Sequence, residues 1–555
     1  MLTLSQLSWY QAKYTHVPFT GHPSSDAIKS SGMFFNKIFA KPFAQLFPLI
    51  FTLVILFAIP ACTRLAEQGS AWSLSSEETP VAAGPIPTAA PLAVTPIVQT
   101  RPNHTPTPDQ PHALPGLRKD PELYTVQPDD TLLLIANRYG VTVEQIVTAN
   151  NLINPDLLEI GQVLEIPAPP PGDPGPGLKL IPDSELVFGP NTADFDIASF
   201  ILNKSGHLAT YLEEVNGEFL TGAQIVERVA QNYSVNPRLL LAVLEHQSGW
   251  VTNSAPKEDT LEFPIGIYDT FREGLYRQLA YAADNLNRGY YLWRVDGLGG
   301  YILSDSRLIP ANPTINAGTA GVQFLFSKLY SADEWREVVS DQGFLQTYIR
   351  LFDYPFNLAY EPLIPSDLTQ PALQLPFEKG EVWHFTGGPH GGWDSGSAWA
   401  ALDFAPPGDA LGCVQSDEWV VAVADGTIVR AGNGAVIQDL DSDVSIADGL
   451  EQTGWVIFYM HIESRDRIRA GTEVKAGERI GHASCEGGVS SGTHVHVARK
   501  YNGEWLPADQ PGLPFVMDGW VSDGTGVEYD GFLARNGIAV EAYVGEEEGI
   551  GEIQR

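Results

Sequence analysis

Apolar residues alternate with histidines in the stretch Ser491–Val497, in the C-terminal part of the chain. Val495 and Val497 occupy every second position, which predicts a β-strand. His494 and His496 then project from the same face of that strand. Two imidazoles on one face can divide a task, because one can bind a metal while the other transfers a proton. The pattern therefore predicts a strand that carries a candidate site.

A helical periodicity dominates the middle of the chain. Residues 223–233 carry apolar side chains at helical spacing, which predicts an amphipathic helix. Asn236 followed by Pro237 is a helix-start signal, and the apolar run to Glu245 predicts a second helix. We therefore expect residues 181–375 to form a separate, mainly helical domain.

A shorter unit precedes the helical domain. Between Tyr124 and Pro167 the apolar pattern predicts a strand, two helices and a second strand. Thr131 is placed to cap the first helix, and Asn150 with Asn151 to end the second. The sequence therefore predicts a compact βααβ module.

Two segments lack the apolar residues needed for a core. Residues 63–120 are rich in Pro, Thr, Ala and Ser, and Pro167–Gly177 consists mostly of Pro and Gly, so both are expected to be extended linkers. The 555 residues leave room for about three or four folded units. The expected organisation is an uncertain extension (1–32), a signal peptide or membrane anchor (33–62), a linker (63–120), the βααβ module (121–168), a Pro/Gly linker (169–180), the helical domain (181–375), a β-rich domain (376–545) and an acidic tail (546–555).

The N-terminal part carries an export pattern. A basic lead, Met33–Lys41, precedes an uncharged apolar run, Pro42–Ala61. The run ends in Ala58–Cys62, which resembles a lipobox and makes Cys62 a candidate lipidation site, although Pro60 is unusual there. The alternative is an uncleaved anchor, because about 20 apolar residues can span a bilayer. Both alternatives tether the protein outside the cytoplasmic membrane.

The charge narrows the range of partners. A formal net charge of −34 argues against nucleic-acid binding, which requires a basic surface, and it suits an exported protein. There are three cysteines, of which Cys413 and Cys485 fall in the β-rich domain. They can form a disulfide, which suits an oxidising exterior, or stay as buried free thiols.

Candidate ligands surround the His-x-His strand. The stretches Gly387–Trp393, Ala401–Gly408 and Ile457–His461 each place a His or an Asp among β-forming residues or turns. A catalytic zinc needs three ligands of this kind and an open fourth position. Such a site activates water and polarises a carbonyl, while further histidines move a proton or steady an oxyanion.

These stretches resemble the LasA/lysostaphin-type zinc endopeptidases of peptidase family M23, which cleave peptide bonds in peptidoglycan. The resemblance covers Trp383–Trp505 and follows the LasA branch, in which twelve residues separate the first His from the Asp. Cys485–Gly488, Val420–Gly426 and Ala470–Gly481 also resemble segments of that family. An all-β antiparallel peptidase domain is the fold that this resemblance implies.

The resemblance also implies residue roles. His390, Asp403 and His496 would bind one Zn²⁺, and His494 and His461 would form the catalytic pair, one as general base and the other stabilising the transition state. Two positions depart from the family pattern. Asp394 is a second candidate carboxylate at the spacing of the lysostaphin branch, but we expect a solvated loop residue there, and Val497 replaces an aromatic outside the metal site.

Three neighbouring residues have less certain places. We expect His384 to be an ordinary strand histidine and His482 to lie at the surface. Tyr459, two residues before His461, would share its face in a regular strand and could then donate a hydrogen bond to an oxyanion. A role in the core is equally open for Tyr459.

The βααβ module resembles LysM modules, which bind N-acetylglucosamine-containing glycans such as peptidoglycan or chitin. The resemblance places the glycan between two loops, and a module that only spaces the domains is the alternative. The candidate glycan-binding residues are Asp130, Thr131, Asn151 and Asn154.

The helical domain resembles lysozyme-like lytic transglycosylases, in which a helix ends in a catalytic Glu beside a Ser. Here Gln247 precedes Ser248, and Glu245 lies two residues earlier, which turns it by roughly 200° around a helix. Gln cannot donate a proton as a general acid. We therefore expect a lysozyme-like fold without that acid, which binds or positions glycan, with activity through Glu245 as the alternative.

Taken together, the sequence predicts an exported, membrane-tethered zinc endopeptidase that cuts peptide cross-links or stem peptides of peptidoglycan. The LysM module would hold it on the polymer, and the Gly-rich loops at 387–392 and 487–492 would leave room for a slim peptide. One alternative is a non-catalytic cell-wall scaffold that activates another hydrolase. A second alternative is glycan-strand cleavage by the helical domain. No chemistry is expected for residues 506–555.

Overall fold

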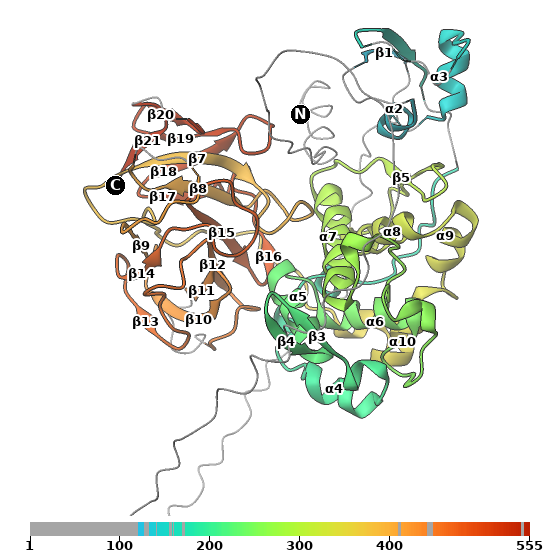
Figure 1. Ribbon diagram of the computed structural model, residues 1–555, viewed down its shortest axis with the longest axis horizontal. Coiled ribbons are helices and arrows are strands. Elements are labelled where there is room, and N and C mark those ends of the chain that lie inside the picture. Colours follow the sequence, from blue (N-terminus) through green and yellow to red (C-terminus); the bar gives the residue numbers. More distant parts are fainter. Residues whose placement is uncertain are drawn as a thin grey trace, which may run out of the picture. The chain divides into compact units, whose positions relative to one another are not determined.

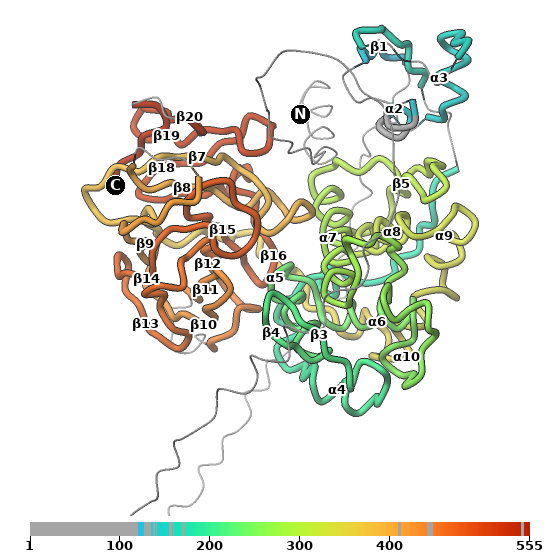
Figure 2. The backbone as a smooth tube through the Cα atoms, viewed as in Figure 1, coloured from blue at the N-terminus to red at the C-terminus, as the bar shows by residue number. Residues whose placement is uncertain are grey.

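A computed structural model describes residues 120–555, except 127–131, 140, 155–157, 159, 169–172, 409–411, 441–447 and 546–548. The path of the chain can be followed in Figures 1 and 2. The extension, the export segment with Cys62 and the linker up to residue 119 lie outside the described residues. A search of the described helices finds none with the length and apolar character needed to cross a bilayer.

The module at 121–168 has the predicted order of elements. Strands β1 (Glu122–Thr125) and β2 (Val163–Ile166) pair antiparallel, and helices α2 (Leu132–Tyr139) and α3 (Val143–Asn150) lie between them in sequence. Asn151 ends α3 in the left-handed conformation at φ 52°. Asn150 accepts a bond from Glu165 N and donates to Glu165 O, so this residue joins the end of α3 to β2.

The region that follows is mainly helical, as predicted. Both expected helices are present: α5 (Gly222–Tyr233) begins with a capping box at Thr221, and α6 (Pro237–Ser248) begins at the Asn236 cap with Pro at its first turn. The stretch around Trp293 is buried in the core of this domain. The other elements are α4 (Ile197–Lys204), α7 (Leu275–Arg294), α8 (Ala317–Leu329), α9 (Ala332–Val338), α10 (Phe344–Phe352) and the short strands β3 (Leu212–Val215), β4 (Glu218–Thr221), β5 (Gly300–Ile302) and β6 (Leu308–Pro310).

A large antiparallel sheet forms the C-terminal domain, which confirms the predicted β-rich architecture. Its strand order is β13-β10-β11-β12-β15-β8-β7-β21, and β16 pairs with β15. The strands are β7 (Val382–His390), β8 (Ala401–Ala405), β10 (Gly426–Gly432), β11 (Ala435–Asp439), β12 (Trp455–Met460), β13 (Glu473–Val474), β15 (Val495–Tyr501), β16 (Glu504–Trp505) and β21 (Glu552–Gln554).

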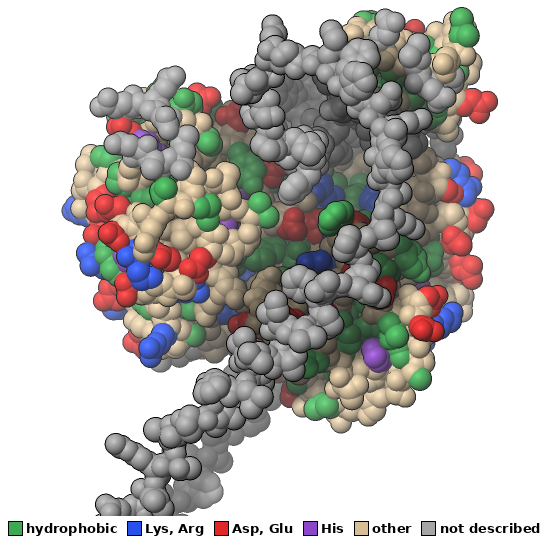
Figure 3. All heavy atoms as spheres, in the orientation of Figure 1, with side chains coloured by type: hydrophobic (Ala, Val, Ile, Leu, Met, Phe, Trp, Pro, Cys, Tyr) green, Lys and Arg blue, Asp and Glu red, His purple; other side chains and the backbone are tan. Residues whose placement is uncertain are grey.

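Residues 506–555 are an integral part of this domain. They form an antiparallel meander of β17 (Val516–Met517), β18 (Trp520–Gly524), β19 (Gly531–Arg535) and β20 (Ile538–Glu541), after which β21 pairs with the edge strand β7. A separate pair, β9 (Trp419–Val421) and β14 (Arg479–His482), completes the domain. On the face shown in Figure 3, acidic and basic side chains are interspersed over the left-hand part of the view.

The two faces of the large sheet contribute to different cores. Val495, Val497 and Tyr459 belong to a cluster within the β domain. Ala498 and Phe458 lie on the other face and share a cluster with buried residues of α5, α6, α7 and α8. The sheet face that carries His496 is therefore packed together with the helical domain.

Trp505 is the first residue to test for this shared core. It is fully buried, and its backbone N–H donates to Tyr291 Oη at 3.0 Å. Its ring packs edge-on against Phe458 at a centroid distance of 5.7 Å. We expect Trp505→Ala to lower the free energy of unfolding by about 3–5 kcal/mol, because a large cavity opens in the core. Calorimetry should show both the helical and the β domain melting earlier, and an unchanged melting profile would contradict the shared core.

Candidate metal centre

Strand register brings three distant side chains to one point. His496 on β15 pairs directly with Asp403 on the neighbouring β8, and His390 ends β7 on the other side of β8. Directly paired residues in an antiparallel sheet lie on the same face. The candidate ligands, separated by up to about a hundred positions in sequence, are therefore neighbours because of the sheet.

The ligand atoms of these three residues converge. Nε2 of His390 lies 2.9 Å from Nδ1 of His496, and Oδ1 of Asp403 lies 3.2 Å from each of those nitrogens. All three residues are buried. Among the residues that the structure describes, this is the one group of three metal-ligating side chains within 4.8 Å of one another.

Hydrogen bonding shows that these atoms suit a cation. Nδ1 of His390 lies 2.8 Å from Gly388 O, and Nε2 of His496 lies 3.1 Å from Gly392 O. A carbonyl oxygen can only accept a hydrogen bond, so each of these nitrogens carries a proton and donates. In the neutral rings the other two nitrogens, Nε2 of His390 and Nδ1 of His496, are therefore unprotonated. Oδ1 of Asp403 also has no hydrogen-bond partner. Three lone pairs that point at one another match the donor set of a zinc site.

The pKa shifts follow from the same geometry. Burial opposes the charged form of Asp403, but His390 and His494 outweigh it and hold the pKa of the carboxyl well below its usual range. Burial also opposes the charged form of His390, yet the Asp403 carboxylate raises the pKa of this imidazole above 6.5. Burial lowers the pKa of His496. Asp403 is thus an anion that favours a cation beside it.

Two further histidines lie beside the three candidate ligands. The rings of His461 and His494 are 4.5 Å apart, and Nε2 of His494 lies 3.7 Å from Asp403 Oδ1. Nδ1 of His494 donates to Gly492 O at 2.8 Å, which leaves Nε2 as the proton-accepting nitrogen. Nδ1 of His461 donates to Glu486 O at 3.1 Å. Burial lowers the pKa of His461 to about 3, so this ring is neutral at neutral pH.

A disulfide fastens the loops that hold this pair. Cys413 and Cys485 are bonded, so the structure contains the bridge rather than two free thiols. Thr493 N donates to Gly412 O beside the bridge. A pocket of about 440 Å³ adjoins it, lined by Cys413, Val414, Gln415, Glu463, Ser484, Cys485 and Glu486.

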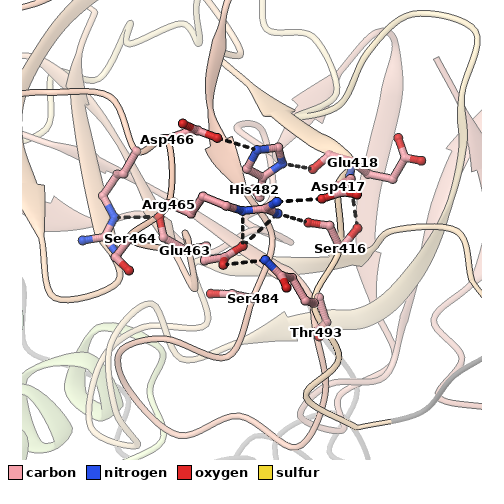
Figure 4. Close-up of polar contacts among 12 residues, drawn as sticks. Ser416, Asp417, Glu418, Glu463, Ser464, Arg465, Asp466, His482, Ser484 and Thr493 are labelled. Carbon is pink, nitrogen blue, oxygen red and sulfur yellow. Dashed lines mark hydrogen bonds and ion pairs between the residues drawn. The ribbon is translucent and has the colours of Figure 1, made fainter.

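The expectation of a surface position for His482 is wrong. The residue is 3% exposed, and its ring packs on the Trp419 ring, donates from Nδ1 to Glu418 O and lies 3.6 Å from Asp466 (Figure 4). Beside it, Arg465 bonds to Ser416 O and pairs with acidic side chains. His482 follows the glycine of a turn in sequence, but β14 pairing carries it into a polar core between two loops.

Tyr459 lies on the opposite face of the sheet from His496. It pairs with Val497, and its hydroxyl donates to Gln438 Oε1 and accepts from Val423 N. Regular alternation from His461 fails because His461 has φ +64°, which ends the strand geometry at that residue. The role in the core is therefore the one that Tyr459 has.

The other neighbours also have defined places. Asp394 is exposed, as expected, and its Oδ2 accepts from Tyr233 Oη at 3.0 Å. It is outside the group that contains Asp403. His384 is a strand residue paired with Glu552 and also lies outside that group.

Tyr529 was missed at the sequence level. Its ring stacks on the His390 ring at a centroid distance of 4.2 Å, and its backbone bonds to Gly388 N and Pro389 O. It lies between β18 and β19 with φ +66°, in a region for which no chemistry was expected. A tyrosine forced into this conformation is unusual, but nothing in the local pattern relates it to His390, so only the folded chain reveals it.

The candidate residues outside the peptidase domain are less informative. Asp130 and Thr131 lie outside the described residues, while Asn151 and Asn154 are exposed.

In the helical domain, the Glu245 carboxylate accepts hydrogen bonds from Val251 N, Thr252 N and Thr252 Oγ1. These bonds keep the carboxylate occupied in shaping the turn after α6.

Comparison with known proteins gives three family matches. The LysM domain matches residues 124–167, the LasA N-terminal domain matches 179–364 and peptidase family M23 matches 409–507. The last match includes His461, His494 and His496, while His390 and Asp403 precede it.

Individual proteins are also similar to parts of this chain. The chain is 26% identical over 355 residues to protease LasA of Pseudomonas aeruginosa, which covers 58% of this chain and 74% of that protein. It is 29% identical over 178 residues to the beta-lytic metalloendopeptidase of Achromobacter lyticus, covering 30% of this chain and 43% of that one. Among solved structures, the M23 metalloprotease pseudoalterin, described as from the deep sea, has 24% identity and a TM-score of 0.27, covering 34% of this chain and all of the other.

These matches, together with the convergent ligand set, define a metalloendopeptidase. More particularly, the chain is a multidomain protein homologous to LasA protease and to the family M23 metallopeptidases, with a LysM domain on the N-terminal side. The helical domain corresponds to the LasA N-terminal domain.

Metal affinity at this site should depend on pH. His390 must lose its proton to become a ligand, and its pKa is raised above 6.5, so protons compete with the metal as pH falls through the neutral range. His496, with a lowered pKa, adds little competition there. We expect zinc affinity to fall about tenfold per pH unit below the pKa of His390. Zinc titration against a chelating dye between pH 5.5 and 8 measures it, and a pH-independent affinity would contradict the assignment of His390.

Proposed function

We propose that this chain is an exported, zinc-dependent endopeptidase that cuts peptide cross-links or stem peptides of the cell wall. The observation that carries the proposal is the convergence of bare ligand atoms from His390, Asp403 and His496. The family matches support peptidoglycan as the substrate polymer. The choice of zinc follows from the two nitrogen ligands and one oxygen ligand.

Zinc would be held by Nε2 of His390, Oδ1 of Asp403 and Nδ1 of His496. When bound, such an ion supplies a water nucleophile at neutral pH and polarises the scissile carbonyl. The protein fixes the three ligands through Gly388 O, Gly392 O and the pairing of β8 with β15. The imidazole rings are therefore oriented by backbone atoms and not by mobile side chains.

The two remaining histidines would handle the proton and the developing charge. Nε2 of His494 takes the proton of the attacking water, because its Nδ1 is committed to Gly492 O. His461 supports the tetrahedral oxyanion, for which its Nε2 must carry a proton. Since Nδ1 of His461 donates to Glu486 O and the lowered pKa of this imidazole keeps the ring neutral, the role requires a change of tautomer in which the proton moves from Nδ1 to Nε2.

The LysM module would keep the enzyme on its polymer. A module bound to glycan raises the local concentration of peptide around the catalytic domain, so the cleft need not bind each peptide tightly. The contacts would come from the loops that contain Asp130, Thr131, Asn151 and Asn154. Asn151 and Asn154 are exposed, as such a contact requires.

Attachment to the outer face of the membrane belongs to the same proposal. The basic lead at 33–41 and the apolar run at 42–61 would direct export, and Cys62 would carry lipid or, alternatively, the run would stay as an anchor. Mass spectrometry of the N-terminal peptide of the exported protein distinguishes the two alternatives. A peptide that begins at acylated Cys62 indicates a lipoprotein, and a peptide that still contains residues 42–61 indicates an uncleaved anchor.

The two rival functions find less support. A scaffold without catalysis is disfavoured because all five site positions are occupied and close together. Glycan cleavage by the helical domain is disfavoured because Gln247 replaces the acid and the bonds from Thr252 occupy Glu245. The lysozyme-like fold of that domain remains part of the proposal.

His496→Ala tests the catalytic assignment. The variant should retain little zinc and release at least about a thousandfold less peptide from purified wall, because loss of a ligand removes the metal on which catalysis depends. His384→Ala is the matched control, since it removes a histidine from β7 outside the ligand group. Normal peptide release by His496→Ala would refute the assignment. New amine ends indicate peptide cleavage, whereas anhydro sugars would support the glycan-cleaving rival.

Removal of residues 121–168 tests the role of the LysM module. We expect the rate on insoluble wall to fall by about tenfold or more, while the rate on a short soluble peptide stays unchanged. The reason is that the module acts through local concentration and not through the catalytic residues. If the truncated protein cut both the insoluble wall and the soluble peptide as fast as the full chain does, glycan targeting would be contradicted.

A further inference from the structure

The loop at 391–397 links the metal centre to the helical domain. It follows His390 directly, and its Gly392 carbonyl accepts the hydrogen bond from Nε2 of His496. Gly392 N donates to Ala398 O at 3.0 Å, which closes the loop on itself. Any shift of this loop therefore moves the acceptor that orients a ligand.

Three side chains of the helical domain hold the tip of this loop. Asp284 on α7 accepts from Gly396 N through Oδ1 at 2.6 Å. Arg288, one turn further along α7, donates to Ser395 Oγ at 2.7 Å. At the end of α5, Tyr233 donates to Asp394 Oδ2 at 3.0 Å. Consecutive residues of the loop are thus each bonded to the helical domain.

The fit at this contact is close. A Cβ atom added to Gly396 would lie 2.0 Å from the carbonyl oxygen of Asp284, so a side chain has no space there. Trp393 packs its ring against Tyr233 and against Phe458 of the sheet. The loop therefore packs against α5, α7 and the sheet face that carries His496, although Asp394 stays exposed.

We propose that Asp284, Arg288 and Tyr233 are positioning residues for the metal centre. They touch neither metal nor substrate, but they fix the loop whose Gly392 carbonyl sets the tautomer and the ring orientation of His496. The inference rests on the proposed metal site and goes beyond it, because it makes the helical domain a part of that site. Partners that orient a ligand through a hydrogen bond commonly change metal affinity by about 10–100-fold.

The charge on Asp284 bears on the choice of variants. Burial, together with the negative charge of Asp394, raises the pKa of Asp284 to about 7, while Arg288 opposes the shift. The contact with Gly396 N needs an acceptor oxygen and not a full charge. Asn at position 284 can keep that oxygen, whereas Ala removes it.

The test measures zinc affinity of the full chain by titration against a chelating dye. We expect Asp284→Ala to bind zinc about tenfold more weakly. Asp284→Asn should stay close to the parent protein, and Tyr233→Phe should show a loss of about threefold because one bond to the loop is removed. Asp333→Asn, at an exposed position of α9, is the matched control and should bind zinc normally.

Outcomes of this test separate the possibilities. Parent-like zinc affinity in both Asp284→Ala and Tyr233→Phe would overturn the proposal. So would increased peptide release at unchanged zinc affinity, because the contact would then only mask the site. If Asp284→Ala does not fold, Tyr233→Phe decides alone, since it removes only a hydroxyl. Absence of zinc binding in the parent protein would instead refute the proposed function.

Discussion

The pairing of β15 with β8 is the constraint on which the site depends. It sets His496 opposite Asp403, and the bulged pairing of β8 with β7 then carries His390 to the same point. A slip of one residue would turn His496 to the opposite face, where Val495 and Val497 pack into the β-domain core. Burial of those valines therefore fixes the register, and the register fixes the ligands.

Backbone carbonyls then determine which nitrogen of each histidine ring carries the proton and which one faces the site. Gly388, Gly392 and Gly492 each accept one imidazole N–H, so that His390, His496 and His494 present their other nitrogens inward. Two of these acceptors lie two positions before and two positions after His390 in sequence, and the third lies in the loop fastened by the disulfide of Cys485. A Cβ atom would lie 2.6 Å from the Asp530 backbone at Gly388 and 2.6 Å from the Trp505 ring at Gly392, so these two positions have no space for a side chain.

Local sequence patterns were enough to predict the helices and strands that are determined by residues close together in the sequence. The period-two apolar positions around His496, the helical periodicity of residues 223–233 and the start signal at Asn236 predicted a strand and two helices that the structure contains. Contacts set by the tertiary fold could not be found in this way. The positive φ of His461 moved Tyr459 to the other face, strand pairing buried His482, and Tyr529 reaches His390 from more than a hundred positions away. The choice of Asp403 over Asp394 came from resemblance to a family, whose LasA branch has the same spacing between the first His and the Asp, and not from the residues alone.

In the helical domain, the polar groups that were candidates for acting on a sugar make contacts within the domain. Glu245 bonds to the turn after α6, and Gln247 accepts from Tyr330, so neither group is free to give a proton to a sugar. What this domain does offer is a surface matched to the β domain: a shared apolar core and polar contacts at the loop beside His390. A domain built to act alone would have no need to bury Phe458 and Trp505 of its neighbour. Under the proposed function, its contribution to the reaction would pass through packing, and the catalytic unit would be larger than the sheet that carries the candidate ligands.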